Sequence, residues 1–174
     1  MFLFTICLCI PANVKAADLV STICSETPNQ KFCSDFLKPF NTPGTTLLGL
    51  AQKTVESSVT YVRLVYDEVH VREIDTMLKN HELHNSFNKC GLAYTKAVND
   101  LIDIGTALKS GGGGGGYRTV HSLAANAVQE IDTCDKLFTP PNGEPFDFKE
   151  LAGKARYVCS IVLALANHLI AGKF

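Results

Sequence analysis

The chain has 174 residues, of which 46% are hydrophobic and 19% are charged, a composition typical of one globular domain and not of a disordered chain. With 16 basic and 17 acidic residues, the formal net charge is −1. This balance excludes the basic surface that binding to nucleic acid or docking on an anionic membrane requires. The 7 cysteines are many for this length.

The first residues are similar to a secretory signal peptide. Residues 2–10 form an uncharged apolar run, and Val14-Lys15-Ala16 offers a cleavage site before Ala17. Pro11 would interrupt the alternative structure, a buried N-terminal helix. We therefore expect residues 1–16 to be removed on export, with loss of Cys7 and Cys9. The remaining five of the 7 cysteines would then lie in a compartment where disulfides form.

Residues 17–43 are predicted to form a short helical hairpin. Cys24 and Cys33 flank Pro28-Asn29, a pair of residues typical of a turn. A disulfide between these cysteines would hold the two short helices together. In the chain-entropy model, a loop of this size contributes roughly 2.5–3 kcal/mol of stability.

Residues 44–174 carry four apolar stripes with helical spacing. The first helix is predicted from about Thr45 to Leu78, with Ile74 and Leu78 continuing its stripe, and Asn80 to Asn85 is predicted to be a connection. The other stripes run from Phe87 to Leu108, from Val120 to Phe138 and from Phe148 to Leu169. The pattern predicts an all-α fold, an up-and-down four-helix bundle preceded by the hairpin.

The short connections of this bundle place two more cysteines at one level. If the run Gly111 to Gly116 is a turn, Cys90 and Cys134 lie about 30 Å and about 26 Å from it along antiparallel neighbouring helices. A Cys90–Cys134 disulfide would contribute about 4 kcal/mol. Cys159 is left over on an apolar stripe and is predicted to be a buried free thiol.

The sequence lacks the residue patterns of the enzymes that this fold could support. No glutamate is followed three residues later by histidine, the spacing of di-metal bundles, and no Gly-x-Ser-x-Gly elbow is present. His81 and His84 are interpreted as part of a solvated loop and not as a metal site. The glycine run follows a predicted helix, whereas a dinucleotide-binding loop follows a strand. We therefore expect no enzymatic activity, metal or cofactor.

The ordered set of motifs resembles the plant invertase and pectin methylesterase inhibitor family over essentially the whole mature chain. The first element is Ile23-Cys24 with Thr27-Pro28, Cys33 and Phe36-Leu37. The second is Cys90 with Tyr94, Ala97 and Leu101. The third is Tyr117 with Ala124, Ala125, Ala127, Thr133-Cys134 and Phe138. The resemblance implies the same fold and the same two disulfides as the spacing does.

The resemblance also implies a secreted, non-catalytic inhibitor of a cell-wall enzyme, acting in the apoplast and monomeric when free. Invertase inhibitors of the family have a Pro-Lys-Phe motif at the turn between the second and third long helices, and here that turn holds the glycine run. Tyr117, Thr133 and Cys159 match the pectin methylesterase branch. We therefore expect a one-to-one complex with a pectin methylesterase, with acid invertase as the alternative target and a non-inhibitory bundle as a second alternative.

Polar residues opposite the apolar stripes are the candidates for contact with such a partner. They lie on the second and third long helices and are Asp100, Asp103, Thr106, Gln129 and Thr133. An inhibitor of this kind would act by covering the substrate cleft of the enzyme. For each single residue, the competing interpretation is an ordinary solvated side chain.

Overall fold

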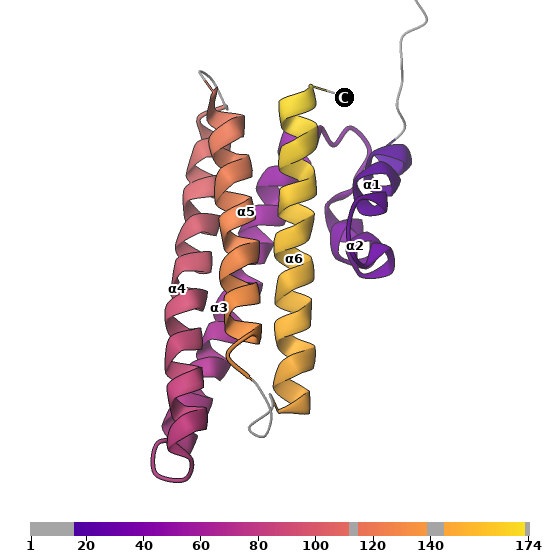
Figure 1. Cartoon of the computed structure of the whole chain (residues 1–174). Coiled ribbons are helices and arrows are strands. Elements are labelled where there is room, and N and C mark those ends of the chain that lie inside the picture. Colours follow the sequence, from indigo (N-terminus) through magenta and orange to yellow (C-terminus); the bar gives the residue numbers. More distant parts are fainter. Residues whose placement is uncertain (1–15, 112–114, 139–144, 173–174) are drawn as a thin grey trace, which may run out of the picture.

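Four long helices lie side by side, and two short helices pack against one side of them (Figure 1). The computed structural model describes residues 16–111, 115–138 and 145–172. Its helices are α1 (Ala16–Ser25), α2 (Gln30–Leu37), the 3-10 helix η1 (Lys38–Phe40), α3 (Leu47–Thr76), α4 (His81–Lys109), α5 (Gly116–Asp135) and α6 (Phe146–Ala171). Most of the predicted signal peptide lies outside the described residues, so its cleavage stays a prediction.

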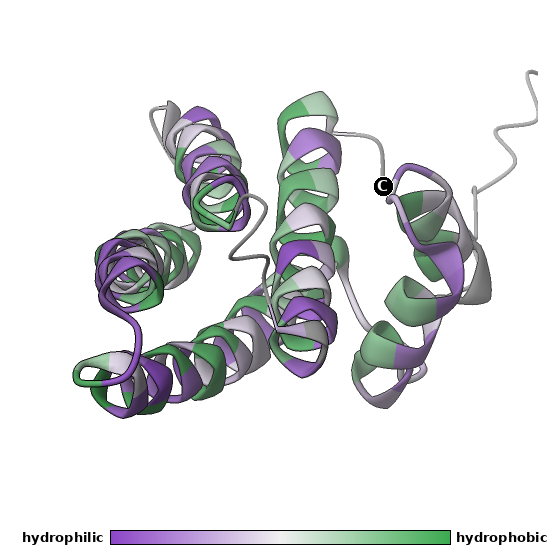
Figure 2. Cartoon of the chain, turned by 60° about the horizontal axis from the view of Figure 1, so that its bottom comes forward, coloured by the Kyte–Doolittle hydropathy of each residue, from purple (hydrophilic) through white to green (hydrophobic). Residues whose placement is uncertain are grey.

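Helices α3 to α6 form an antiparallel bundle in which each helix packs against the next and α6 packs back against α3. Every long helix carries both hydrophobic and hydrophilic residues in Figure 2, as expected of amphipathic helices. Each long helix contributes to one shared core, with fully buried side chains such as Val62, Leu101, Ile131 and Leu165. The predicted all-α fold, a four-helix bundle preceded by a helical hairpin, is confirmed.

Side-chain caps explain where α2 and α3 begin. The Asn29 Oδ1 accepts a hydrogen bond from the Phe32 N–H at 3.0 Å, at the start of α2. The Thr46 Oγ1 accepts one from the Gly49 N–H at 3.1 Å, at the start of α3. These bonds satisfy backbone donors that have no partner within their own helix.

The connection between α3 and α4 is shorter than the predicted segment Asn80 to Asn85. Helix α4 begins at His81, because the Asn80 Oδ1 caps it by accepting from the Leu83 N–H at 3.1 Å. The polar residues after Asn80 form the first turns of α4, at the end of the molecule where α3 passes to α4 (Figure 1). An apolar stripe is not needed in these turns, because they extend away from the core.

The predicted stripe of α3 is wrong at its end. Ile74 and Leu78 do not continue the core face, since their side chains are 55% and 96% exposed. The core face ends at Val69, which is fully buried. The five-residue step from Val69 to Ile74 turns the helix by about 140° beyond a full turn, so Ile74 faces outward, and Leu78 lies past the end of α3 at Thr76.

The two short helices of the N-terminal hairpin pack mainly on α6, and η1 after them contacts α3 (Figure 1). A Cys24–Cys33 disulfide joins α1 to α2, with 5.5 Å between the Cα atoms. The Phe32 ring lies 5.6 Å from the Tyr157 ring, and the His168 Nε2 lies 3.2 Å from the Glu26 Oε1. The predicted division between hairpin and bundle, at residues 43 and 44, falls in the segment between η1 and α3.

None of the helices in the described residues combines the length and the apolar character that crossing a membrane requires.

Candidate functional site

The residues predicted to contact a partner lie on two neighbouring helices, α4 and α5. Asp100, Asp103 and Thr106 belong to α4, and Gln129 and Thr133 belong to α5. Asp100 is half-buried, and the other four are exposed. Because α4 and α5 are antiparallel neighbours, Asp100 and Gln129 line one shallow hollow of about 470 Å³. We call the outer surface of α4 and α5 that carries these five residues, with the hollow between them, the α4/α5 face.

Four further polar residues line the same hollow and were not among the predicted contacts. They are Lys96, Asn99, Asn126 and Glu130. A salt bridge of 3.5 Å between the Lys96 Nζ and the Glu130 Oε1 joins the two helices across the hollow. The signal that could have found these residues is their helical spacing, since they lie next to, or three or four residues from, Asp100 and Gln129.

The hollow has an acidic character that depends on pH. Partial burial raises the pKa of Asp100 above its ordinary value, and the nearby charges of Glu130 and Asp103 raise it further. The Lys96 ammonium acts in the opposite direction on this pKa. Asp100 therefore takes up a proton at a higher pH than a free aspartate does, and the α4/α5 face loses negative charge as the pH falls.

The two threonines of the predicted set lie far from one another along the bundle. The Thr106 Oγ1 donates to the Ile102 carbonyl at 3.2 Å, and the Thr133 Oγ1 donates to the Gln129 carbonyl at 2.8 Å. Each hydroxyl uses its proton within its own helix and keeps acceptor capacity for a partner. Thr106 lines the groove described next and not the hollow, so the five predicted residues do not form one cluster.

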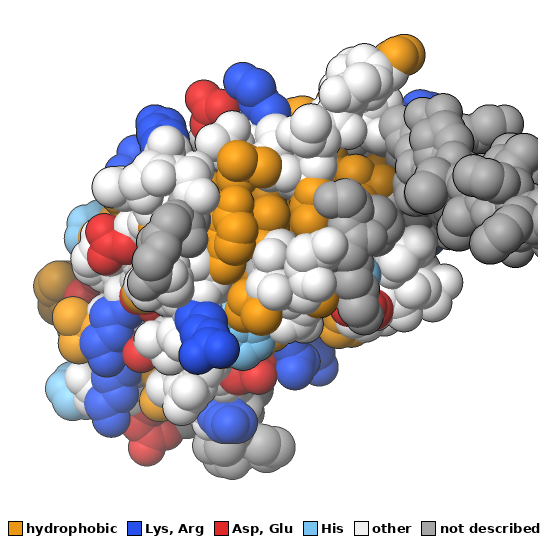
Figure 3. Space-filling model, turned by 90° about the horizontal axis from the view of Figure 1, so that it is seen from above, with side chains coloured by type: hydrophobic (Ala, Val, Ile, Leu, Met, Phe, Trp, Pro, Cys, Tyr) orange, Lys and Arg blue, Asp and Glu red, His pale blue; other side chains and the backbone are white. Residues whose placement is uncertain are grey.

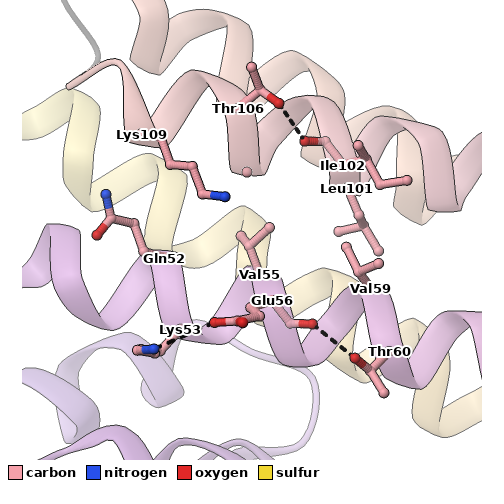
Figure 4. Close-up of a pocket in the computed structure, with 11 residues that line it drawn as sticks. Gln52, Lys53, Val55, Glu56, Val59, Thr60, Leu101, Ile102, Thr106 and Lys109 are labelled. Atoms are coloured by element: carbon pink, nitrogen blue, oxygen red, sulfur yellow. Dashed lines mark hydrogen bonds and ion pairs between the residues drawn. The ribbon is translucent and has the colours of Figure 1, made fainter.

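A groove of about 550 Å³ runs between α3 and α4 beside this face (Figure 4). Its apolar part consists of Val55, Val59, Leu101, Ile102 and Gly105. Lys109 and Gln52 reach over one end of it, and a 3.5 Å ion pair between Lys53 and Glu56 lies along one edge (Figure 4). The apolar stripes do not predict this groove, because a stripe assigns residues to a helix face but does not show where two helices separate.

The second disulfide joins α4 to α5 at the other end of the bundle from the glycine run. Cys90 and Cys134 are bonded, with 4.6 Å between their Cα atoms, as the level of the two cysteines predicts. Cys159 on α6 is fully buried and forms no disulfide. Burial, helped by the charge of Asp100, raises the pKa of Cys159 to about 12, so this thiol is not a nucleophile at neutral pH.

The histidines considered as metal ligands lie in the first turn of α4 and not in a solvated loop. The His84 Nδ1 is 2.9 Å from the Glu73 carbonyl oxygen, and the His81 Nδ1 is 3.1 Å from the Asn85 Nδ2. Within residues 16–111, 115–138 and 145–172, no three His, Cys, Asp or Glu side chains are grouped so that they could hold a metal ion. Tyr94, which belongs to the second motif of the family resemblance, is fully buried in the core.

Gly111 and Gly115 lie at the end of the bundle where α4 passes to α5. Gly111 and Gly115 take φ values of +76° and +100°, a left-handed conformation that favours glycine over other residues. Residues 112–114 of the run lie outside the described part of the chain. Seen from above, this end of the molecule exposes hydrophobic side chains near its centre, with charged side chains toward the margin (Figure 3).

Comparison with known proteins identifies the family. The sequence model described as "Plant invertase/pectin methylesterase inhibitor" matches residues 18–165. A protein of Actinidia deliciosa named "Pectinesterase inhibitor" is 24% identical over 163 residues, which is 92% of this chain and 85% of that protein.

Solved structures agree with this match at the level of the fold. The crystal structure of mutant form A of a pectin methylesterase inhibitor from Arabidopsis superposes with a TM-score of 0.73 at 21% identity, over 85% of this chain and 95% of that one. A pectin methylesterase inhibitor from Arabidopsis thaliana gives a TM-score of 0.64 at 21% identity, over 88% and 97% of the two chains. Since the family model spans both the hairpin and most of the bundle, this protein belongs to the plant invertase/pectin methylesterase inhibitor family.

Proposed function

We propose that the protein is a secreted inhibitor of pectin methylesterase that binds the enzyme about one to one and covers its pectin-binding cleft. The observation that carries the proposal is membership of an inhibitor family over residues 18–165. The similarity to the Actinidia deliciosa pectinesterase inhibitor, over 92% of this chain, favours pectin methylesterase as the target.

Such an inhibitor needs a rigid polar surface, because the inhibitor acts by keeping pectin out of the cleft and catalyses no reaction itself. The α4/α5 face fits this role, since the Cys90–Cys134 disulfide and a fully buried core fix the two helices relative to each other. A specific complex buries roughly 1,200–2,000 Å² in total, which requires the face to act together with neighbouring surface such as the α3/α4 groove. The contacts we propose on these two surfaces are Asp100, Asp103, Thr106, Gln129 and Thr133.

Two sequence features favour the esterase over acid invertase. The turn between α4 and α5 holds glycines in place of the Pro-Lys-Phe motif of invertase inhibitors. Tyr117, Thr133 and Cys159 agree with the esterase branch. Invertase remains the alternative target, and a non-inhibitory bundle of the same fold is the second alternative.

Export to the apoplast is part of the proposal. The apolar run in residues 2–10 supports it, as do two disulfides, which form and persist outside the cytosol. We expect the full chain, expressed in a secreting plant host, to appear in the medium with Ala17 as its first residue. Mass spectrometry of the secreted protein tests this expectation, and retention of residues 1–16 would contradict it.

Titration of enzyme activity tests the inhibition. The secreted protein is added in steps to a pectin methylesterase and, separately, to an acid invertase. We expect esterase activity to fall to a plateau near one equivalent and invertase activity to stay constant. Inhibition of invertase alone would replace the proposed target, and no effect on either enzyme would leave the protein as a non-inhibitory member of the family.

A pair of charge variants tests the α4/α5 face. We expect Asp103→Lys with Gln129→Lys to raise the inhibition constant at least tenfold, because two new cations would be buried against the enzyme. The control is Ser34→Lys on the exposed surface of α2, which should leave the constant unchanged. Equal effects of the control and the double variant would place the contact elsewhere.

A further inference from the structure

The α3/α4 groove offers a preformed apolar hollow on the side of α4 next to the α4/α5 face (Figure 4). Val55 and Leu101 line its base and are 2% and 0% exposed. Val59 is half-buried and Ile102 is 38% exposed, so both present apolar surface to solvent. Because the base of the groove belongs to the close-packed core of the bundle, the groove keeps its shape before a partner arrives.

A hydrogen bond between α3 and α4 fixes one end of the groove. The Gln52 Nε2 donates to the Leu108 carbonyl oxygen at 3.1 Å. Gln52 is half-buried and lines the groove, and Leu108 is buried in the core. This bond joins the two helices that form the walls, so a shift of α3 that closed the groove would also break it.

The glycine at position 105 leaves the groove open. Gly105 lies inside α4, where glycine is less favourable for helix stability than alanine. Its φ is not in the left-handed region, so the backbone does not require glycine. A Cβ atom added there would lie 3.7 Å from the Val55 Cγ1, which is an ordinary contact, so crowding does not require glycine either. The effect of the glycine is a space beside Val55 that a larger side chain would fill.

The groove also carries one positive charge that has no carboxylate partner. Three charged residues line it, and two of them, Lys53 and Glu56, pair with each other at 3.5 Å. The third, Lys109, makes no ion pair within the part of the chain that the structure describes. Its side chain extends over the end of the groove that Gln52 lines (Figure 4). An occupant of the apolar part would therefore be favoured by an anionic group at this end.

The groove is continuous with the surface proposed to contact the esterase. Thr106 belongs to the α4/α5 face and also lines the groove. Asp103, another residue of that face, directly follows Ile102 on α4. Since both surfaces share α4, an enzyme that sits on the α4/α5 face also reaches the groove. The enzyme is therefore the occupant that the position of the groove favours.

We infer that the α3/α4 groove receives an apolar side chain of the pectin methylesterase, with a carboxylate of the enzyme beside it that pairs with Lys109. The inference rests on the proposed function and adds what the enzyme must supply at the rim of its cleft: a large aliphatic or aromatic residue next to an aspartate or glutamate. That side chain would be the anchor of the complex, and the polar contacts of the α4/α5 face would surround it and exclude water.

Filling the groove from within provides the main test. Gly105→Leu places a side chain where that of the enzyme would lie, and we expect it to raise the inhibition constant for the esterase at least tenfold. Gly105→Ala fills less of the space and should have a smaller effect in the same direction. The matched controls are Gly153→Leu and Gly153→Ala on α6, where an added Cβ meets no atom within 4 Å, and they should leave the constant unchanged. All four variants remove a helix glycine, so their helix propensity changes in the same direction.

Charge reversal tests the carboxylate of the enzyme. We expect Lys109→Glu to raise the inhibition constant at least tenfold, because two carboxylates would then face each other. Lys79→Glu makes the same change in net charge at an exposed position at the opposite end of the bundle and should have little effect. Equal effects of the two variants would overturn the pairing with Lys109, since only the overall charge would then matter.

Methyl NMR distinguishes failure of this inference from failure of the proposed function. When the esterase is added to the secreted protein, the methyl signals of Val55, Val59 and Ile102 should shift, and that of the exposed Val71 should not. Wild-type inhibition without these shifts, or equal inhibition by Gly105→Leu, would overturn the inference and leave the proposed function in place. Absence of wild-type inhibition would overturn both. Concentration-dependent shifts without enzyme would also overturn the inference, because a second copy would then occupy the groove.

Discussion

The bundle and the N-terminal hairpin are both helical, yet they are stabilised in different ways. The bundle has a continuous core to which all four long helices contribute, with an aromatic cluster of Phe87, Phe138 and Phe148 near one end. The hairpin has two short helices, a disulfide over a sequence separation of 9, and contacts with α6. We therefore expect damage to the bundle to unfold the whole protein, and damage to the hairpin to stay local.

The largest expected effect comes from the aromatic cluster of the bundle. Phe148 is fully buried, its ring lies 5.3 Å from that of Phe87 and 5.7 Å from that of Phe138, and the Arg72 guanidinium is 5.7 Å from its centre. Phe148→Ala should lower the free energy of unfolding by about 4 kcal/mol. Guanidinium denaturation measures this loss, and Leu92→Ala, at an exposed position, should change it by less than about 0.5 kcal/mol. A loss near 1 kcal/mol for Phe148→Ala would mean that the cluster is not part of the cooperative core.

Removing each disulfide sharpens the comparison. The Cys90–Cys134 bond closes a sequence separation of 44, and its replacement by two alanines should cost about 4 kcal/mol of global stability. The Cys24–Cys33 bond closes a separation of 9, and the same replacement should cost about 2.6 kcal/mol. Hydrogen exchange should locate the second loss in α1 and α2 alone. Faster exchange in α4 after loss of Cys24–Cys33 would show that hairpin and bundle unfold together.

Removing a helix cap should compare the bundle and the hairpin again, with a smaller loss of stability than removing a disulfide. Asn80→Ala removes the cap of α4, and Asn29→Ala removes the cap of α2. Each should cost about 1 kcal/mol. Denaturation should detect the first change in the global transition, whereas amide exchange should detect the second only in the hairpin. If Asn80→Ala leaves the global transition in place, the first turns of α4 are independent of the core.

The smallest expected effects concern pH and have opposite signs in the two regions. The Lys31 ammonium, which hydrogen-bonds the carboxylate, lowers the pKa of Asp35 in the hairpin, so this contact stabilises above the ordinary aspartate pKa and is lost as pH falls. Burial and the nearby charge of Asp132 raise the pKa of Asp135 in the bundle, so its ionised form costs stability until the pH falls through that raised pKa.

Two conservative variants test these signs. At pH 7, Asp35→Asn should speed amide exchange in the hairpin, and Asp135→Asn should raise the free energy of unfolding of the bundle. Both differences from wild type should shrink as the pH falls, that of Asp135 first because its pKa is raised and that of Asp35 last because its pKa is lowered. A stabilising effect of Asp135→Asn that does not decrease as the pH falls below the ordinary aspartate pKa would point to a cause other than charge.

Periodicity and cysteine spacing predict the architecture because both depend on regular helix geometry. The stripe from Phe87 to Leu108 consists of buried residues throughout its predicted positions, and the level of Cys90 and Cys134 follows from the rise per residue. The prediction failed where a periodic pattern continued beyond the core, at Ile74 and Leu78. Spacing alone does not say whether a neighbouring element is present to cover a stripe.

The candidate site was less predictable than the fold. Helical spacing placed Asp100 and Gln129 on facing polar surfaces, and the structure brings them to one hollow. The α3/α4 groove depends on the separation of two helices and on the missing side chain of Gly105, and no local pattern encodes that separation.

The burial of Cys159 has a consequence for how the protein oxidises. Disulfide exchange requires a thiolate, and with a pKa of about 12 only about one Cys159 thiol in 100,000 is ionised at pH 7. Once α6 has packed, this fifth cysteine of the expected mature chain takes no part in disulfide exchange. An odd number of cysteines would otherwise favour scrambled isomers and disulfide-linked dimers, so the packing of α6 protects the pairing of the other four cysteines from exchange with the fifth.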